Sequence, residues 1–260
     1  MSTRSRRTAA RRRAMTVAMG GLLLSVGLPT LVEGQQFAGD NQWTAPHGVG
    51  TFAATAGEQY AQLFAIAALF PDWEFNVQLN YYYDDPRVGT DSYTAVNLYA
   101  KHRLSENEAQ TGGYSIFFGT GLYPEHLDQG TVATAFHSWW TSVTATYPFL
   151  DDRLLLDVVP GVAVNFDDEQ TGETAWGFTY ASRVALYGVV PQSALVAEVF
   201  GTAGEAYARP AYRAGVRWES ARWIVAGTYS APFDGSTGIG FELGVIVFTD
   251  PVFCFGGCGS

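Results

Sequence analysis

Apolar and polar residues alternate strictly through much of this chain, and this alternation restricts its possible folds more than any other feature. Between Trp73 and Tyr81 every second residue is apolar or aromatic, and the residues between them are Glu, Asn or Gln. The same period of two recurs in 154–166, 212–219 and 239–248. Because successive side chains of a strand point to opposite faces, the pattern predicts β-strands with one face in an apolar medium.

About twelve such segments follow residue 35, and most are long, with 11 to 16 residues. Strands of globular proteins usually have about five or six residues, whereas a strand tilted by about 45° crosses a bilayer core with roughly 9–11. Strand length therefore favours a membrane barrel over a soluble sandwich. The segments lie at approximately 48–55, 58–70, 72–84, 92–104, 112–123, 133–147, 152–166, 174–189, 193–203, 209–219, 221–231 and 237–248.

Short and long connections alternate between these segments. The connections at 70–73, 149–152 and 219–222 are short, whereas those at 84–91 and 124–132 are longer and rich in Asp, Gly or Pro. Bacterial outer-membrane barrels have short periplasmic turns and longer outside loops. We therefore expect an all-β fold, a transmembrane antiparallel up-and-down β-barrel of about 12 strands over residues 48–249. We expect it to be a monomer with both chain ends in the periplasm.

Aromatic residues are placed as in the interfacial girdles of such barrels. Trp218 and Trp223 flank one short turn and Trp73 lies beside another, whereas Tyr81 and Tyr83 precede a long connection. The alternative, that these aromatics fill a soluble core, leaves the polar faces of the long strands unexplained. In the membrane interpretation the apolar faces meet lipid, and the polar and glycine-rich faces line the lumen.

Residues 1–34 have the features of a cleaved signal peptide. Six arginines between Arg4 and Arg13 precede an apolar run from Ala14 to Val32, and a usable cleavage point lies before Gln35. An N-terminal membrane anchor is the alternative, although the run is near the lower length limit for a spanning helix. The leader predicts export to the outer membrane of a Gram-negative bacterium. Residues 35–47 then form a periplasmic N-terminal segment, and 250–260 form a C-terminal tail.

The charge balance excludes nucleic acid as a partner. The chain has a net charge of −10 and only 15% charged residues, against about 25% in soluble domains. Without the leader, 9 basic and 24 acidic residues remain. Such a chain repels phosphates.

No motif for catalysis is present, and we predict that the protein is not an enzyme. The four histidines lack metal-ligand spacing, and the chain has no G-x-S-x-G, P-loop or H-E-x-x-H motif. His137 and Ser138 are neighbours on a predicted strand, so they point to opposite faces and cannot act as base and nucleophile. A membrane-embedded lipid hydrolase is therefore the least favoured function.

The two cysteines, Cys254 and Cys258, both lie in the tail. In an exported chain they are candidates for a short-loop disulfide. A metal-binding fragment is the other use of this spacing, but no histidine lies nearby.

The predicted lumen carries almost balanced charges. Pairing strands across the long loops places Glu74 near Lys101, Asp157 near Arg183, and Glu198 near Arg213. Chance pairs in a charged interior are the alternative. A nearly neutral lumen predicts weak ion selectivity, because strongly selective pores are lined by one sign of charge. The lumen-lining charged residues are Glu74, Lys101, Arg103, Asp157, Arg183, Glu198, Arg213, Arg217 and Glu242.

The predicted long loops are acidic, with eleven acidic and two basic residues. One loop carries Asp167, Asp168, Glu169 and Glu173, whose carboxylates suit Ca²⁺ or Mg²⁺ shared with neighbouring lipopolysaccharide. Solvated carboxylates that keep the surface soluble are the simpler interpretation. No other cofactor is expected.

Two short motifs add a family resemblance. Pro46-His47-Gly48-Val49 before the first strand and Gly240-Phe241-Glu242-Leu243-Gly244 in the last resemble the outer-membrane transporters associated with meta-pathway phenol degradation. The resemblance implies a narrow pore or transporter for passive passage of small solutes. A non-conducting structural or adhesion-type barrel acting through its acidic external loops is the alternative. The expected partners are membrane lipid, lipopolysaccharide and the outer-membrane assembly machinery. Such barrels usually end on an aromatic residue, whereas here twelve residues follow Phe248.

Overall fold

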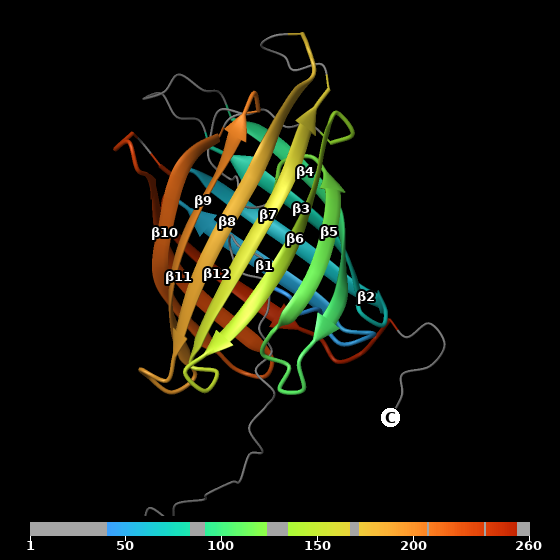
Figure 1. Ribbon diagram of the computed structural model, residues 1–260, viewed down its shortest axis with the longest axis vertical. Coiled ribbons are helices and arrows are strands. Elements are labelled where there is room, and N and C mark those ends of the chain that lie inside the picture. Colours follow the sequence, from blue (N-terminus) through green and yellow to red (C-terminus); the bar gives the residue numbers. More distant parts are fainter. Residues whose placement is uncertain are drawn as a thin grey trace, which may run out of the picture.

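The computed structural model describes residues 41–83, 92–123, 135–166, 172–206, 208–236 and 238–253, and within them twelve strands form one closed barrel (Figure 1). Among these residues no helix is long and apolar enough to cross a membrane. The strands are β1 (Gly50–Gly57), β2 (Tyr60–Phe70), β3 (Trp73–Tyr82), β4 (Tyr93–Glu106), β5 (Gly113–Thr120), β6 (Ser138–Phe149), β7 (Leu154–Asn165), β8 (Ala175–Tyr187), β9 (Ser193–Gly204), β10 (Ala208–Glu219), β11 (Trp223–Pro232) and β12 (Gly240–Phe248).

Each strand pairs antiparallel with its neighbours along the chain, and β1 pairs with β12 to close the sheet. The closing register runs from Thr51 opposite Phe248 to Gly57 opposite Glu242. Closure leaves no unpaired edge, which is the condition a sheet must meet in an apolar medium. The predicted all-β, up-and-down barrel of twelve strands is confirmed, and every strand lies over its predicted segment.

The connections gather at two ends of the barrel (Figure 1). The turn end holds the short connections 71–72, 107–112, 150–153, 188–192 and 220–222, and the loop end holds the others. Asp72 and Gln192 take positive φ angles of 63° and 57°, which lets the chain reverse within a few residues. Sorting by length is less strict than predicted, because Glu58 and Gln59 alone join β1 to β2 and residues 205–207 alone join β9 to β10.

The predicted alternation separates an outer and an inner face. On β3, Glu74, Asn76, Gln78 and Asn80 are buried inside the barrel, whereas Phe75, Val77, Leu79 and Tyr81 are exposed on the outside. Every strand exposes at least one large apolar side chain. Examples in chain order are Phe52, Leu63, Val77, Leu104, Phe118, Val143, Val162, Phe178, Leu195, Val216, Val225 and Leu243.

The interior is filled in three layers along the barrel. A middle layer of apolar side chains includes Phe64, Tyr99, Phe117, Trp140 and Phe200. A second cluster, with Ile224, Ile246 and Phe248, lies at the turn end, and a third, with Tyr60, Tyr82 and Ile239, lies at the loop end. The interior therefore holds aromatic side chains as well as the polar residues expected from the sequence.

Candidate functional site in the barrel lumen

Charges of alternating sign run across four neighbouring strands inside the barrel. Asp157 on β7 lies opposite Arg183 on β8, Arg183 lies opposite Glu198 on β9, and Glu198 lies opposite Arg213 on β10. All four side chains are buried. These residues, Asp157, Arg183, Glu198 and Arg213, form the charged row. Each residue of the row thus lies opposite a residue of opposite charge on the adjacent strand, and adjacent strand backbones are about 4.8 Å apart.

The first pair of the charged row is closely hydrogen-bonded. The Nε of Arg183 donates to Oδ2 of Asp157 at 2.7 Å, and its Nη2 lies 2.6 Å from the same oxygen. The hydroxyl of Thr146 donates to the other carboxylate oxygen at 2.6 Å. Such contacts offset the cost of burying both charges.

Arg213 connects the charged row to β12. Its Nε donates to Glu242 at 3.0 Å, whereas its Nη1 lies 3.6 Å from Oε2 of Glu198. The hydroxyls of Tyr60 and Thr228 also donate to Glu242, the latter at 3.2 Å. The guanidinium lies over the ring of Phe200, 5.4 Å from its centroid. Arg213 therefore bridges two carboxylates but holds one of them much more closely.

A separate group lies nearer the turn end. Arg217 forms an ion pair with Glu219 and donates to the hydroxyl of Tyr187, whose ring centroid is 5.5 Å from its guanidinium carbon. Both charged side chains are buried. Glu219 was not among the predicted lumen residues, because the pattern placed it in the adjoining turn.

Glu74 and Lys101 lie opposite each other on β3 and β4, and both are buried. Each also contacts the chain that precedes β1. Oε1 of Glu74 accepts a hydrogen bond from the backbone N–H of Ala45 at 2.6 Å, and Nζ of Lys101 donates to the carbonyl of Trp43. These two charges therefore hold a segment inside the barrel.

That segment, residues 41–49, enters the lumen from the turn end and is called the inner segment. Asn41, Gln42, Thr44 and Ala45 are buried. The N–H of Gln42 donates to Thr146 at 3.0 Å, and the hydroxyl of Ser115 donates to the carbonyl of Asn41 at 3.3 Å. Residues 41–47, assigned to a periplasmic segment from the sequence, thus occupy the mouth of the barrel. The alternation that predicts strands does not extend into these residues, and the motif at Pro46-His47-Gly48-Val49 does not indicate where they lie.

Arg103 lies at the rim of the turn end. Its side chain is 22% exposed and pairs with Asp72 and with Glu106, the latter at 2.9 Å. The neighbouring His102 stacks on Trp73 with ring centroids 4.3 Å apart. Arg103 therefore stabilises the β2–β3 turn and stands apart from the charged row.

Apart from the charged row, inward aromatic residues of β2, β4, β5 and β6 gather inside the barrel. Trp140 contacts Tyr99, Tyr123 and Phe117, with ring centroids 5.3, 5.2 and 5.6 Å away. Phe64 stacks on Tyr99 at 5.9 Å. These five residues form the aromatic cluster. Sequence reasoning missed it because β4–β6 carry aromatic or apolar residues on both faces, as in Phe117-Phe118 and Trp139-Trp140.

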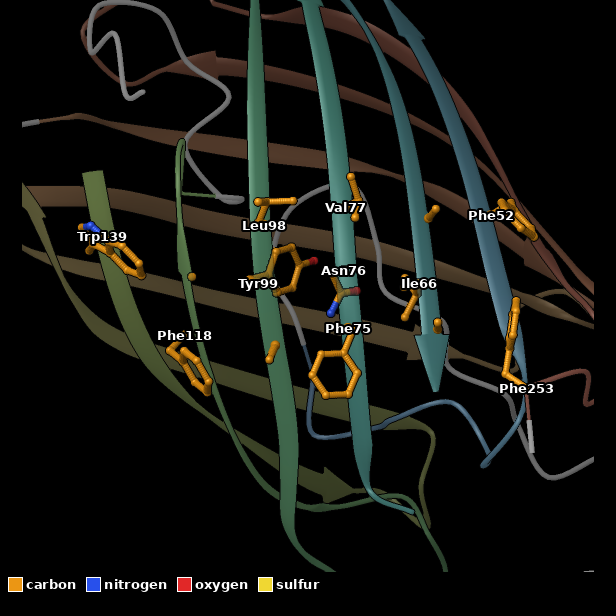
Figure 2. Close-up of a pocket in the computed structure, with 14 residues that line it drawn as sticks. Phe52, Ile66, Phe75, Asn76, Val77, Leu98, Tyr99, Phe118, Trp139 and Phe253 are labelled. Atoms are coloured by element: carbon orange, nitrogen blue, oxygen red, sulfur yellow. The ribbon is translucent and has the colours of Figure 1, made fainter. Parts of the chain in front are cut away.

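An apolar groove lies on the outside of the barrel. Its volume is about 580 Å³, and its lining includes Phe52, Phe75, Val77 and Phe118 from β1, β3 and β5, together with Phe253 (Figure 2). Phe253 is held there by a hydrogen bond from its N–H to the carbonyl of Gly48 at 3.0 Å. Inside the barrel, a pocket of about 30 Å³ lies near the loop end beside Tyr123, Trp140 and Thr202.

The remaining candidate sites lie mostly outside the described residues. Asp167, Asp168 and Glu169 of the acidic loop are not described, and Glu173 is exposed just before β8. No group of three metal-ligating side chains occurs in the described part of the chain. Cys254 and Cys258 also lie outside the described residues.

Comparison with known proteins finds matches among solved structures alone. No family model and no curated protein matches the chain, so the resemblance to the phenol-degradation transporters is not confirmed. The structure is similar to the crystal structure of the COG4313 outer membrane channel from Pseudomonas putida F1. The identity is 14%, the TM-score is 0.49, and the match covers 82% of this chain and 99% of that chain. At this level the likeness identifies neither family nor function.

Proposed function

We propose that this protein is a transmembrane barrel of the bacterial outer membrane that lets small solutes pass through a narrow lumen. The observation that supports this most strongly is the division of the two faces. All twelve strands expose large apolar side chains to the outside, and acids, arginines and amides are buried inside. A soluble barrel needs the reverse arrangement, whereas a closed sheet in lipid needs this one.

The short connections of the turn end support an orientation with that end in the periplasm, and aromatic residues lie near both ends, as in interfacial girdles. Trp218 and Trp223 are exposed on the outer face, and both adjoin the turn 220–222. Tyr81 and Tyr83 are exposed near the loop end. In this orientation the acidic loops face lipopolysaccharide. The leader directs export, and the outer-membrane assembly machinery inserts the barrel.

The filling of the lumen supports slow passage. The inner segment occupies the turn end, and the aromatic cluster occupies the middle. The charged row contains two acids and two arginines, so its formal charge is balanced. We therefore expect small conductance and weak ion selectivity.

Fractionation tests the membrane assignment. The mature chain should be recovered with the outer membrane and should migrate differently on gels before and after heating, as folded barrels do. Recovery as a soluble periplasmic protein would contradict the proposal.

Planar bilayers test passage. The full mature chain should give small single-channel currents, and deletion of residues 35–47 should increase them severalfold because the deletion empties the mouth at the turn end. The occluded lumen also fits the second candidate, a non-conducting structural or adhesion-type barrel. Absence of current from both forms, each shown to be folded by heat-modifiability, would favour that candidate.

A further inference from the structure

The charged row has a weak link between Glu198 and Arg213. Their closest charged atoms are 3.6 Å apart, beyond hydrogen-bond reach, whereas Arg183 and Asp157 approach to 2.6 Å. Nη1 and Nη2 of Arg213 and Oε1 of Glu198 are fully buried and have no hydrogen-bond partner among the described residues. Buried polar atoms normally have partners, so these three atoms mark a place where another group is expected.

Further groups that could contact a solute lie beside the gap between Glu198 and Arg213. Ser230 on β11 lies directly opposite Arg213, and its buried hydroxyl also has no partner among the described residues. The next inward position on β11, Thr228, also carries a small side chain. The ring of Phe200 lies under the guanidinium at 5.4 Å. The link thus offers two N–H donors, one hydroxyl and one carboxylate acceptor beside an apolar surface.

The charges of Arg213, Glu198 and Glu242 decide which chemical group could bind beside these residues. A carboxylate would accept from both guanidinium nitrogens, but Glu198 and Glu242 would repel it. A neutral group with an acceptor and a donor meets both needs, because its oxygen accepts from Arg213 and its N–H or O–H donates to Glu198. We propose that Arg213, Glu198 and Ser230 form a solute-contact site in the lumen that prefers small neutral carboxamides to carboxylates of the same shape.

This proposal rests on the proposed function only in that solutes must enter the lumen. The test therefore measures binding to the full mature chain in detergent, independently of conduction. Acetamide and acetate serve as probes because they match in size and shape and differ in charge. Saturation-transfer NMR with dilution series should give a Kd for acetamide at least fivefold lower than that for acetate.

Two charge-neutralising variants locate the preference. Glu198→Gln removes the repulsion and keeps an acceptor oxygen, so the acetate-to-acetamide ratio of Kd values should fall at least fivefold. Glu219→Gln makes the same change at another buried acid, in the Arg217 group, and should leave the ratio unchanged. No binding of either probe to the folded wild-type chain, or a ratio that Glu198→Gln leaves unaltered, would overturn the proposal.

Conductance measured on the same preparations separates the two proposals. A preference for acetamide without channel current contradicts the proposed passage of solutes and leaves the contact site standing. Channel current without the preference supports passage and overturns the site.

Discussion

The two halves of the inner wall are built from the same strand geometry but are held together by different interactions. Across β7–β10 the charged row pairs buried acids with buried arginines. On β2, β4, β5 and β6 the aromatic cluster packs rings at centroid distances of 5.2–5.9 Å. Burying a charge is costly unless a partner of opposite sign is well placed, whereas ring packing depends on contact area and tolerates small shifts. A single substitution should therefore lower the free energy of unfolding more in the charged row than in the aromatic cluster.

Removing one member of the charged row should lower the free energy of unfolding more than a single change on the outer face or in the aromatic cluster. Asp157→Ala leaves Arg183 buried without its carboxylate, which costs about 3–5 kcal/mol. Arg183→Met should be similarly harmful alone, and the double variant should cost less than the sum of the two. Unfolding of refolded barrels in urea, read by gel mobility, measures all three.

An exposed ion pair supplies the control for this cycle. Asp250 pairs with Arg222 at 2.7 Å and is 72% exposed, so Asp250→Ala should cost about 0–1 kcal/mol. Strict additivity in the Asp157–Arg183 cycle would show that the charged row does not stabilise the barrel as a set of pairs.

Placing a charge on the outer face should have the next largest effect. Val216 is 56% exposed on the outside of β10, next to the inward Arg217. Val216→Arg should cost roughly 2–4 kcal/mol in lipid vesicles if the residue lies near the bilayer midplane. Val190→Arg, in the β8–β9 turn, should cost little, since that turn lies outside the strands. Equal costs at the two positions would mean that the outer face does not meet lipid.

A single substitution in the aromatic cluster should lower the free energy of unfolding less than a substitution in the charged row. Phe117→Leu keeps an apolar side chain but removes ring contacts with Trp140 and Tyr123, and we expect a loss of about 1–2 kcal/mol. Phe118→Leu is the matched control, because the adjacent ring is 48% exposed on the outer face and should cost less. A Phe117→Leu effect as large as that of Asp157→Ala would remove the contrast between the two halves.

The contrast also explains what could be predicted from the sequence. Alternation identified the strands, and parity placed the charged row on one face. Asp157, Glu198 and Arg213 lie between apolar outward neighbours, and Arg183 precedes the outward Val184. Alternation could not show which of Phe117 and Phe118 points inward, since both are apolar. The position of the inner segment depends on long-range contacts with Glu74 and Lys101, which have no local signature.

Outside the barrel, an exposed carboxylate provides the smallest expected effect and a reference for the buried row. Hydrogen bonds from the hydroxyl and backbone N–H of Ser236 hold the pKa of Asp234 below its ordinary value, and Oδ1 accepts the backbone bond at 2.9 Å. A lowered acid pKa contributes stability above the unfolded pKa, and this contribution is lost as the pH falls through the folded pKa. Ser236→Ala removes the hydroxyl but keeps the backbone N–H, so the pKa of Asp234 should rise part of the way back. Carboxyl NMR titration measures the shift. The free energy of unfolding at neutral pH should change by no more than about 0.5 kcal/mol, as for other surface substitutions. A larger loss would show that the hydrogen bonds between Ser236 and Asp234 stabilise the barrel. Carboxylates outside the charged row would then also contribute to its stability.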